Sequence, residues 1–157
     1  MKVVIASDIS GFRLKEAVKN HLISAGYDID DVGQRQEEEK VLYFETASNL
    51  ARAVQSGKYD RGIVICATGA GVSLIVNKFK GIYCVACESI YTAERTSLIN
   101  NANVLAMGEK VVSFDMGAEM AEKWLRGIWC DSFTEQRRKN NEKGFAVLKG
   151  IEAENYK

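Results

Sequence analysis

Five short, β-branched apolar runs alternate with amphipathic stretches along this chain, and this alternation constrains its fold more than any other feature. The runs cover residues 3–6, 27–32, 62–66, 82–86 and 104–107 and are continuous in apolar character, as in strands covered on both faces of a parallel sheet. The stretches between them have helical spacing. This order predicts a Rossmann-like α/β fold with a five-stranded, doubly wound parallel sheet, whose ligands bind beyond the carboxyl ends of the strands.

The length and the last segment predict how the chain is organised. A chain of 157 residues fits one domain, so we expect a single domain over residues 1–157, with an α/β core over 1–130 and a helical tail over 131–157. The tail is charged and has only a thin apolar side. We therefore expect it to pack on a neighbouring subunit, in a homodimer or homotetramer.

The charge balance and the lack of targeting segments narrow the class of partner. Lys plus Arg and Asp plus Glu both number 21, so no global field favours nucleic acid or a membrane surface, and the expected partner is a small molecule. We find no signal peptide and no apolar span of membrane length, which predicts a cytoplasmic protein. Four cysteines without a secretory signal indicate thiols rather than disulfides.

The stretch most informative for chemistry is Ile-Cys-Ala-Thr-Gly-Ala-Gly-Val at residues 65–72, where a strand ends on Cys66 and a small-residue turn leads into a helix. The backbone N–H groups of such a turn can face an oxyanion or phosphate. The same field favours a thiolate, which suits a nucleophile or general base. A buried structural cysteine beside a tight turn explains these residues equally well.

Two further polar groups are candidates for the same chemistry. Asp8 follows the first strand, so it lies at the same sheet edge as Cys66, where it could relay protons, bind a sugar hydroxyl or simply cap a helix. Asn100 opens an Asn-Asn-Ala-Asn sequence before the fifth strand. Its amides could hold substrate hydroxyls or form an ordinary turn.

The remaining cysteine and histidine patterns do not indicate a metal or redox site. Cys84 and Cys87 have a C-x-x-C spacing, but the period of a strand turns them to opposite faces and no second pair completes a site. The single histidine, His21, lies inside the first predicted helix. We interpret it as structural, which leaves no histidine to act as acid or base.

Several short motifs, taken together in order, are specific to one family. They are Ser7-Asp8 with Gly11-Phe12 and Lys15, Cys66-Ala67-Thr68-Gly69-Ala70-Gly71, Asn77-Lys78 with Gly81-Ile82, Tyr91-Thr92-Ala93, Asn100-Asn101-Ala102-Asn103-Val104-Leu105 with Gly108, and Gln136 with Arg138. Over residues 1 to about 138 the chain thereby resembles the family of ribose-5-phosphate isomerase B and the two galactose-6-phosphate isomerase subunits.

The resemblance implies an aldose–ketose isomerase of a small sugar phosphate that needs no metal or other cofactor. In that family the cysteine moves a proton between carbons 1 and 2, and a turn holds the cis-enediolate. Carried to this chain, the catalytic group comprises Cys66, Thr68 and Asp8. The substrate contacts are Ala67, Gly69, Ala70, Gly71, Asn100 and Tyr43, and the phosphate contacts are Arg138, Arg137 and Lys110.

Departures from the family pattern predict the substrate. Ile9 and Ile99 stand where the ribose enzyme has histidines, one of them thought to open the sugar ring, and Thr134 and Lys110 stand where it has arginines. A tetrose 4-phosphate cannot form a five-membered ring and needs no ring opening. Residues 91–95, together with residues 100–102, are also similar to the erythrulose-4-phosphate branch. We expect D-erythrulose 4-phosphate/D-erythrose 4-phosphate, with ribose 5-phosphate/ribulose 5-phosphate as the family default.

Two other functions remain open on the sequence. The chain could be a sugar-phosphate-binding subunit of a heteromeric galactose-6-phosphate-type isomerase that is inactive alone. It could also be a nucleotide-binding or signalling α/β domain that uses the turn at residues 69–71. Retained Cys66 and Thr68 favour catalysis, whereas the missing histidines favour dependence on a partner chain.

Overall fold

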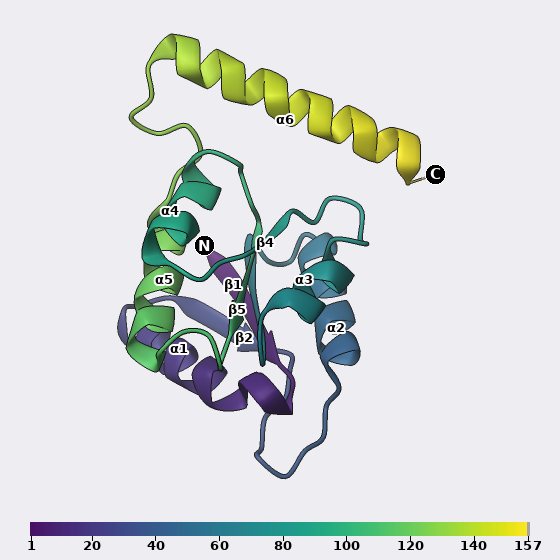
Figure 1. Cartoon of the computed structure of the whole chain (residues 1–157), viewed down its shortest axis with the longest axis vertical. Coiled ribbons are helices and arrows are strands. Elements are labelled where there is room, and N and C mark those ends of the chain that lie inside the picture. Colours follow the sequence, from purple (N-terminus) through teal and green to yellow (C-terminus); the bar gives the residue numbers. More distant parts are fainter. Residues whose placement is uncertain (157) are drawn as a thin grey trace.

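Five parallel strands form the central sheet of the computed structural model, which describes residues 1–156 (Figure 1). The strand order is β2-β1-β3-β5-β4, and every neighbouring pair is parallel. The strands are β1 (Lys2–Ser7), β2 (Asp28–Asp31), β3 (Arg61–Cys66), β4 (Cys84–Ala86) and β5 (Val104–Gly108). The predicted five-stranded parallel sheet is confirmed.

Helices cover both faces of the sheet (Figure 1). One face carries α1 (Phe12–Ser24), α4 (Ile90–Leu98) and α5 (Phe114–Arg126), and the other carries α2 (Tyr43–Gln55) and α3 (Ala70–Val76). The chain crosses from strand to helix to parallel strand throughout. The doubly wound α/β architecture predicted from the alternation is therefore confirmed.

Two apolar layers hold the helices on the sheet. Towards α1 and α5, Ile5, Ile63 and Leu105 pack with the fully buried Trp124. Towards α2 and α3, the alternate strand residues, such as Val64, pack with residues of those helices. Each fully buried side chain of this kind contributes about 1.5–3 kcal/mol, so the three central strands form a rigid support for the loops at their ends.

The outer strands differ from the prediction. The runs at 27–32 and 82–86 shorten to β2 and β4, and β2 is half-buried rather than covered on both faces. The physical reason is that β2 pairs on one side only, so its aspartates reach polar partners. Asp30 accepts a hydrogen bond from Tyr59 (2.7 Å), and Asp31 accepts one from the buried Lys15 (2.6 Å).

The last helix, α6 (Glu135–Asn155), stands apart from the two helical layers (Figure 1) and has no buried residue. Glu152 ties it to the loop before β4 by accepting hydrogen bonds from Gly81 N (2.6 Å) and the Tyr83 hydroxyl (3.0 Å). The ring of Phe145 packs against Tyr83. These contacts place α6 over the amino ends of the strands.

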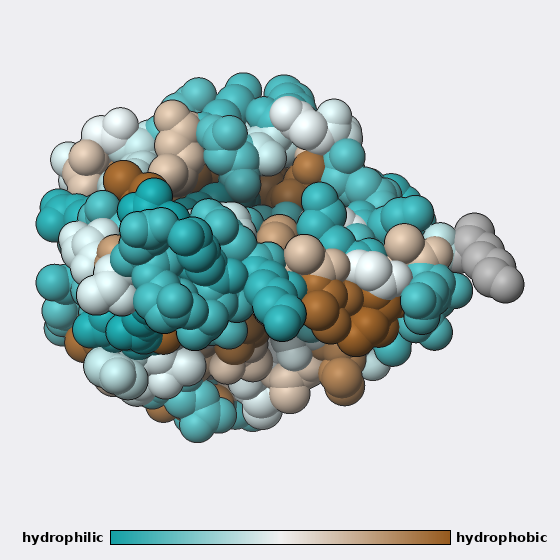
Figure 2. Space-filling view, turned by 90° about the horizontal axis from the view of Figure 1, so that it is seen from above, coloured by the Kyte–Doolittle hydropathy of each residue, from teal (hydrophilic) through white to brown (hydrophobic). Residues whose placement is uncertain are grey.

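Apolar surface is exposed along α6. Figure 2 views this end of the molecule and shows hydrophobic residues among hydrophilic ones towards the C-terminus. Val147, Leu148 and Ile151 are 55%, 40% and 57% exposed. The packing of this helix on a neighbouring subunit stays a prediction. Within residues 1–156, no helix combines the length and apolar character needed to cross a membrane.

Candidate active site

A cavity of about 270 Å³ opens at the carboxyl ends of β1 and β3. It brings together Asp8, Tyr43, Cys66 and Thr68, which the sequence had predicted as site residues. Ala67 and Gly71, also predicted as site residues, line the cavity as well, together with Ser10, which was not predicted. Ligands of doubly wound folds bind at this edge of the sheet, so the cavity is the candidate active site.

The turn after β3 positions the thiol. Cys66 is the last residue of β3 and is only 6% exposed. Gly69 has φ +78°, a left-handed conformation that favours glycine, and this turns its N–H onto the Cys66 Sγ at 3.2 Å. The turn therefore directs a backbone donor at the sulfur.

This geometry corrects one detail of the expected anion cradle. The N–H of Gly69 was expected to face the enediolate, but it is used by the sulfur. The N–H of Ala70 points at the Thr68 Oγ1 at 3.4 Å. Of the predicted turn donors, Gly71 lines the cavity, as does Thr68.

Asp8 is held in a buried position beside the thiol. It is 7% exposed and caps the 3₁₀ turn of residues 9–11 by accepting the Gly11 N–H at 3.1 Å. Burial raises the pKa of Asp8, and the negative charge of Glu109 adds to this; the N–H groups of Ser10 and Gly11 act in the opposite sense, and the net change is upward. Asp8 is thus both a cap and a cavity residue.

Two residues after β5 border the same edge. The N–H of Glu109 donates to the Cys66 carbonyl (2.9 Å), and that of Lys110 donates to the Ala67 carbonyl (3.0 Å). Lys110 is exposed, and its contact with the substrate phosphate stays a prediction. The sequence reasoning missed Glu109, whose carboxylate accepts from Leu14 N at 3.0 Å, because nothing in a single sequence connects residues 95 positions apart.

Ser10 and Tyr43 both line the cavity. Ser10 was not predicted; its place in the polar loop after the first strand was the available signal. Tyr43 is 43% exposed, and a Cβ added to Gly71 would meet its ring at 3.1 Å. A glycine at 71 thus lets the Tyr43 ring close over the start of α3.

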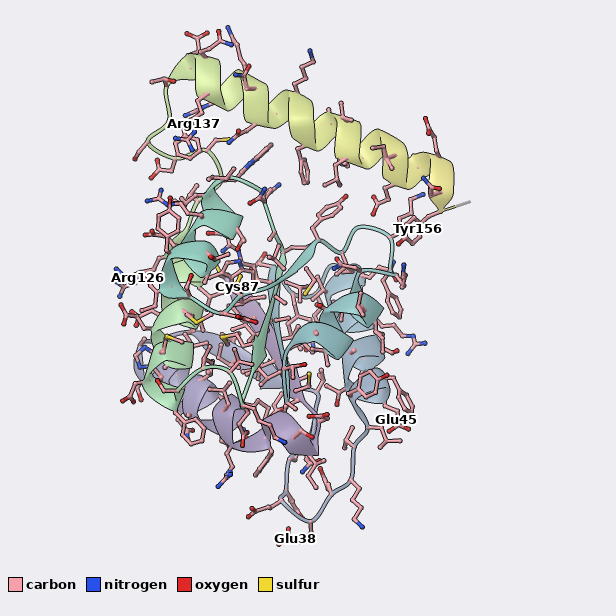
Figure 3. The ribbon with its side chains drawn as sticks, viewed as in Figure 1. Glu38, Glu45, Cys87, Arg126, Arg137 and Tyr156 are labelled. Atoms are coloured by element: carbon pink, nitrogen blue, oxygen red, sulfur yellow. The ribbon has the colours of Figure 1, made fainter. Side chains whose placement is uncertain are left out.

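The structure does not bring Asn100, Arg137 or Arg138 into this cavity. Asn100 precedes β5 and lines another cavity, of about 220 Å³, next to α6. Arg137 and Arg138 are exposed at the start of α6. Figure 3 places Arg137 at one end of the molecule and Glu45, in the first turn of α2, towards the other. Within one chain, these three residues therefore lie at the amino edge of the sheet.

The other cysteines and the histidine lie outside the site. Cys84 and Cys87 pack on opposite faces of the sheet, as predicted, with free thiols. Cys87 lies between the sheet and the α4 side (Figure 3), and burial raises the pKa of its thiol to about 11. His21 is in the last turn of α1 and pairs with Glu122 at 2.6 Å. Among residues 1–156, no cluster of potential ligands could hold a metal ion.

Comparison with known proteins identifies close relatives. The family model described as Ribose/Galactose Isomerase matches residues 3–143. A 4-deoxy-4-sulfo-D-erythrose isomerase from Clostridium sp. (strain MSTE9) is 44% identical over 138 residues, covering 88% of this chain and 87% of the relative. D-erythrulose-4-phosphate isomerase 2 from Mycolicibacterium smegmatis is 37% identical, covering 80% and 84%. Ribose-5-phosphate isomerase B from Clostridium thermocellum superposes with a TM-score of 0.82 at 35% identity, covering 96% and 99%.

Proposed function

Because this chain belongs to the ribose/galactose isomerase family and is an aldose–ketose isomerase, we propose that it interconverts a four-carbon aldose and ketose that carry an anionic group, phosphate or sulfonate, on carbon 4. The observation that carries the proposal is the small cavity in which the Cys66 thiol meets Asp8 and Thr68, together with the isoleucines at positions 9 and 99.

Cys66 is the proposed base. Its thiolate takes a proton from carbon 2 of the aldose or carbon 1 of the ketose, and the electron pair moves towards the carbonyl oxygen to form a cis-enediolate. The hydroxyl of Thr68 and the N–H of Gly71 stabilise the developing oxyanion. The thiol then returns the proton to the neighbouring carbon. The Gly69 N–H, which points at the sulfur at 3.2 Å, supports this role because it fixes the position of the sulfur in the cavity.

The two isoleucines support an open-chain substrate. Ile9 is 47% exposed beside Asp8, and neither it nor Ile99 can donate or accept the protons that opening a furanose ring requires. A tetrose with phosphate or sulfonate at carbon 4 has no free oxygen there to close the ring. Two relatives named for four-carbon substrates, one a sulfo sugar and one a phosphate, favour the same size.

We also propose that two subunits complete the site. Asn100, Arg137 and Arg138 lie at the amino edge of the sheet, whereas Cys66 lies at the carboxyl edge. They can contact the substrate anion only if a second copy presents its amino edge to this cavity. The exposed apolar side chains of α6 supply a surface for that contact, and Lys110 contributes charge from the same chain as the thiol.

The test is turnover of a substrate panel by the purified protein. We expect it to interconvert erythrulose 4-phosphate or 4-deoxy-4-sulfoerythrose, and Cys66→Ala to lose activity by at least about 100-fold, in the range for general acid–base groups. Cys87→Ala is the matched control, because it removes a buried thiol outside the cavity. Full turnover by Cys66→Ala would refute the assignment of the base. A folded protein inactive on every substrate would favour a heteromeric subunit instead.

A further inference from the structure

An aldose–ketose isomerisation moves two protons, and Cys66 accounts for only one of them. The aldose has a carbonyl at oxygen 1 and a hydroxyl at oxygen 2, and the ketose has the reverse. A proton must therefore leave oxygen 2 and arrive at oxygen 1. Histidine is the usual group for such a transfer, but the only histidine, His21, is bound to Glu122 on α5.

Among residues 1–156, Asp8 is the only one with a carboxyl group that lines the Cys66 cavity. Its Oδ1 already accepts the Gly11 N–H, an arrangement compatible with a neutral carboxylic acid that donates through its other oxygen. The ring of Tyr43 and the thiol of Cys66 are the other titratable groups facing the cavity. Neither is cationic, so neither stabilises a carboxylate at position 8.

Three contacts fix Glu109 at the sheet edge that carries Cys66 and Asp8. Its backbone N–H donates to the Cys66 carbonyl (2.9 Å), and its carboxylate accepts from Leu14 N (3.0 Å) and Arg13 Nε (3.3 Å). The Glu109 side chain is only 13% exposed, whereas Arg13 is 71% exposed and only weakly offsets its charge. A negative charge is thus held at the same edge of the sheet as Asp8, on the segment whose backbone is bonded to Cys66.

We propose that Asp8 carries the proton between the two substrate oxygens, and that Glu109 is a positioning residue that keeps this proton on Asp8. The proposal rests on the proposed isomerase activity and deepens it. Burial of Asp8 and the charge of Glu109 both raise the pKa of the Asp8 carboxyl, which agrees with the geometry.

The step balances without a further reactant. The Cys66 thiolate takes the proton of carbon 2, the C–H electron pair forms the C1=C2 double bond, and oxygen 1 receives the carbonyl π pair, which gives the cis-enediolate. Oxygen 1 then takes the proton of Asp8. The Asp8 carboxylate then takes the proton of oxygen 2, whose electron pair forms the new carbonyl. The C1=C2 π pair takes the proton from the Cys66 sulfur onto carbon 1. Both side chains end as they began.

The test compares hydrogen exchange with isomerisation in D₂O, with erythrulose 4-phosphate as the probe. Exchange at carbon 1 needs only Cys66, whereas product formation also needs the transfer between oxygens. We expect Asp8→Asn to raise the ratio of exchange in residual substrate to product formed by at least about tenfold. Nuclear magnetic resonance of the residual substrate and the product measures both quantities in one sample.

Glu109→Gln tests the positioning role, because glutamine keeps an acceptor for Leu14 N and removes the charge. In Glu109→Gln the ratio of exchange to product formed should rise less than in Asp8→Asn. It should return to the wild-type value as the pH is lowered, since Asp8 then regains its proton. Asp8→Asn should not recover. Glu109→Asp should rescue in part, and Glu119→Gln, an exposed carboxylate on α5, should leave the ratio unchanged.

Each result decides the matter. Equal losses of exchange and isomerisation in Asp8→Asn would overturn the proposal, as would a changed ratio in Thr68→Val with none in Asp8→Asn, since the hydroxyl would then carry the proton. A ratio in Glu109→Gln that stays high at low pH would reject the positioning role. Wild-type protein that shows neither exchange nor turnover would instead refute the proposed function.

Discussion

Replacing Gly69 with alanine should abolish most of the isomerase activity at a modest cost in stability. Gly69 has φ +78°, a conformation that costs a residue with a Cβ about 1–2 kcal/mol. The new Cβ would also meet the backbone of Met107 at 3.0–3.3 Å. The turn must shift to relieve this contact, and its N–H leaves the position 3.2 Å from the Cys66 sulfur.

The size of the catalytic effect follows from the lost donor. Because this N–H faces the base rather than the oxyanion, its loss removes part of the roughly 10²–10⁴-fold contribution of a general base, and we expect kcat to fall by at least about tenfold. Gly57→Ala is the matched control, because Gly57 has φ +76° with no atom within 4 Å of an added Cβ. Both variants should lose stability, by about 2–4 °C in Tm for each kcal/mol, but only Gly69→Ala should lose activity.

Steady-state kinetics on erythrulose 4-phosphate and thermal unfolding of both variants supply the comparison. The reasoning is refuted if Gly69→Ala folds and keeps kcat within about threefold of wild type, because the donor to the sulfur would then have no part in the reaction. A loss of activity in Gly57→Ala as large as that in Gly69→Ala would show that backbone strain alone, rather than the turn at the thiol, is responsible.

Three further predictions concern stability and assembly. The raised pKa of Asp8 means that the folded protein binds the Asp8 proton more tightly than the unfolded chain does. The stability that this proton contributes is therefore lost as the pH rises from 3.8 through the folded pKa. Asp8→Asn should have a higher Tm than wild type at about pH 8, and an equal Tm would contradict this. Glu152→Ala removes the acceptor of two hydrogen bonds to α6, so it should weaken docking of the helix by about 1–3 kcal/mol. Amide exchange in α6 should become faster, and the Tyr83 pKa should fall from about 12. Unchanged amide exchange would argue against this anchor. Ile151→Glu should convert the oligomer to monomers in light scattering, whereas the control Lys149→Glu should not, and a wild-type monomer would refute the proposed assembly.

The fold was largely predictable because its strong signals are local. Continuous apolar runs marked the three central strands, and helical spacing marked α1, α2 and α5. The outer strands were predicted too long, because an apolar run does not reveal on which side a strand lacks a neighbour. The aspartates of β2 bind Lys15 and Tyr59, and these contacts between distant parts of the chain mark β2 as an edge strand.

The site was predictable where its residues follow strands. Cys66 and Asp8 both follow their strands and so share one edge, whereas Asn100 precedes β5 and lies at the other. That order was available in the sequence and separates Asn100 from the thiol within one chain. The direction in which the Gly69 N–H points could not be predicted from the sequence, because it depends on one backbone torsion angle. The role of Glu109 depends on a carboxylate that reaches across to the start of α1.

The most direct test of the proposed function is the ratio of kcat/KM for four-carbon and five-carbon substrates with one preparation of the protein. Erythrulose 4-phosphate and 4-deoxy-4-sulfoerythrose should each be compared with ribose 5-phosphate. Because Ile9 and Ile99 provide no acid or base for ring opening, we predict that the better four-carbon substrate exceeds ribose 5-phosphate by at least about 100-fold. Equal or greater kcat/KM for ribose 5-phosphate would contradict the account.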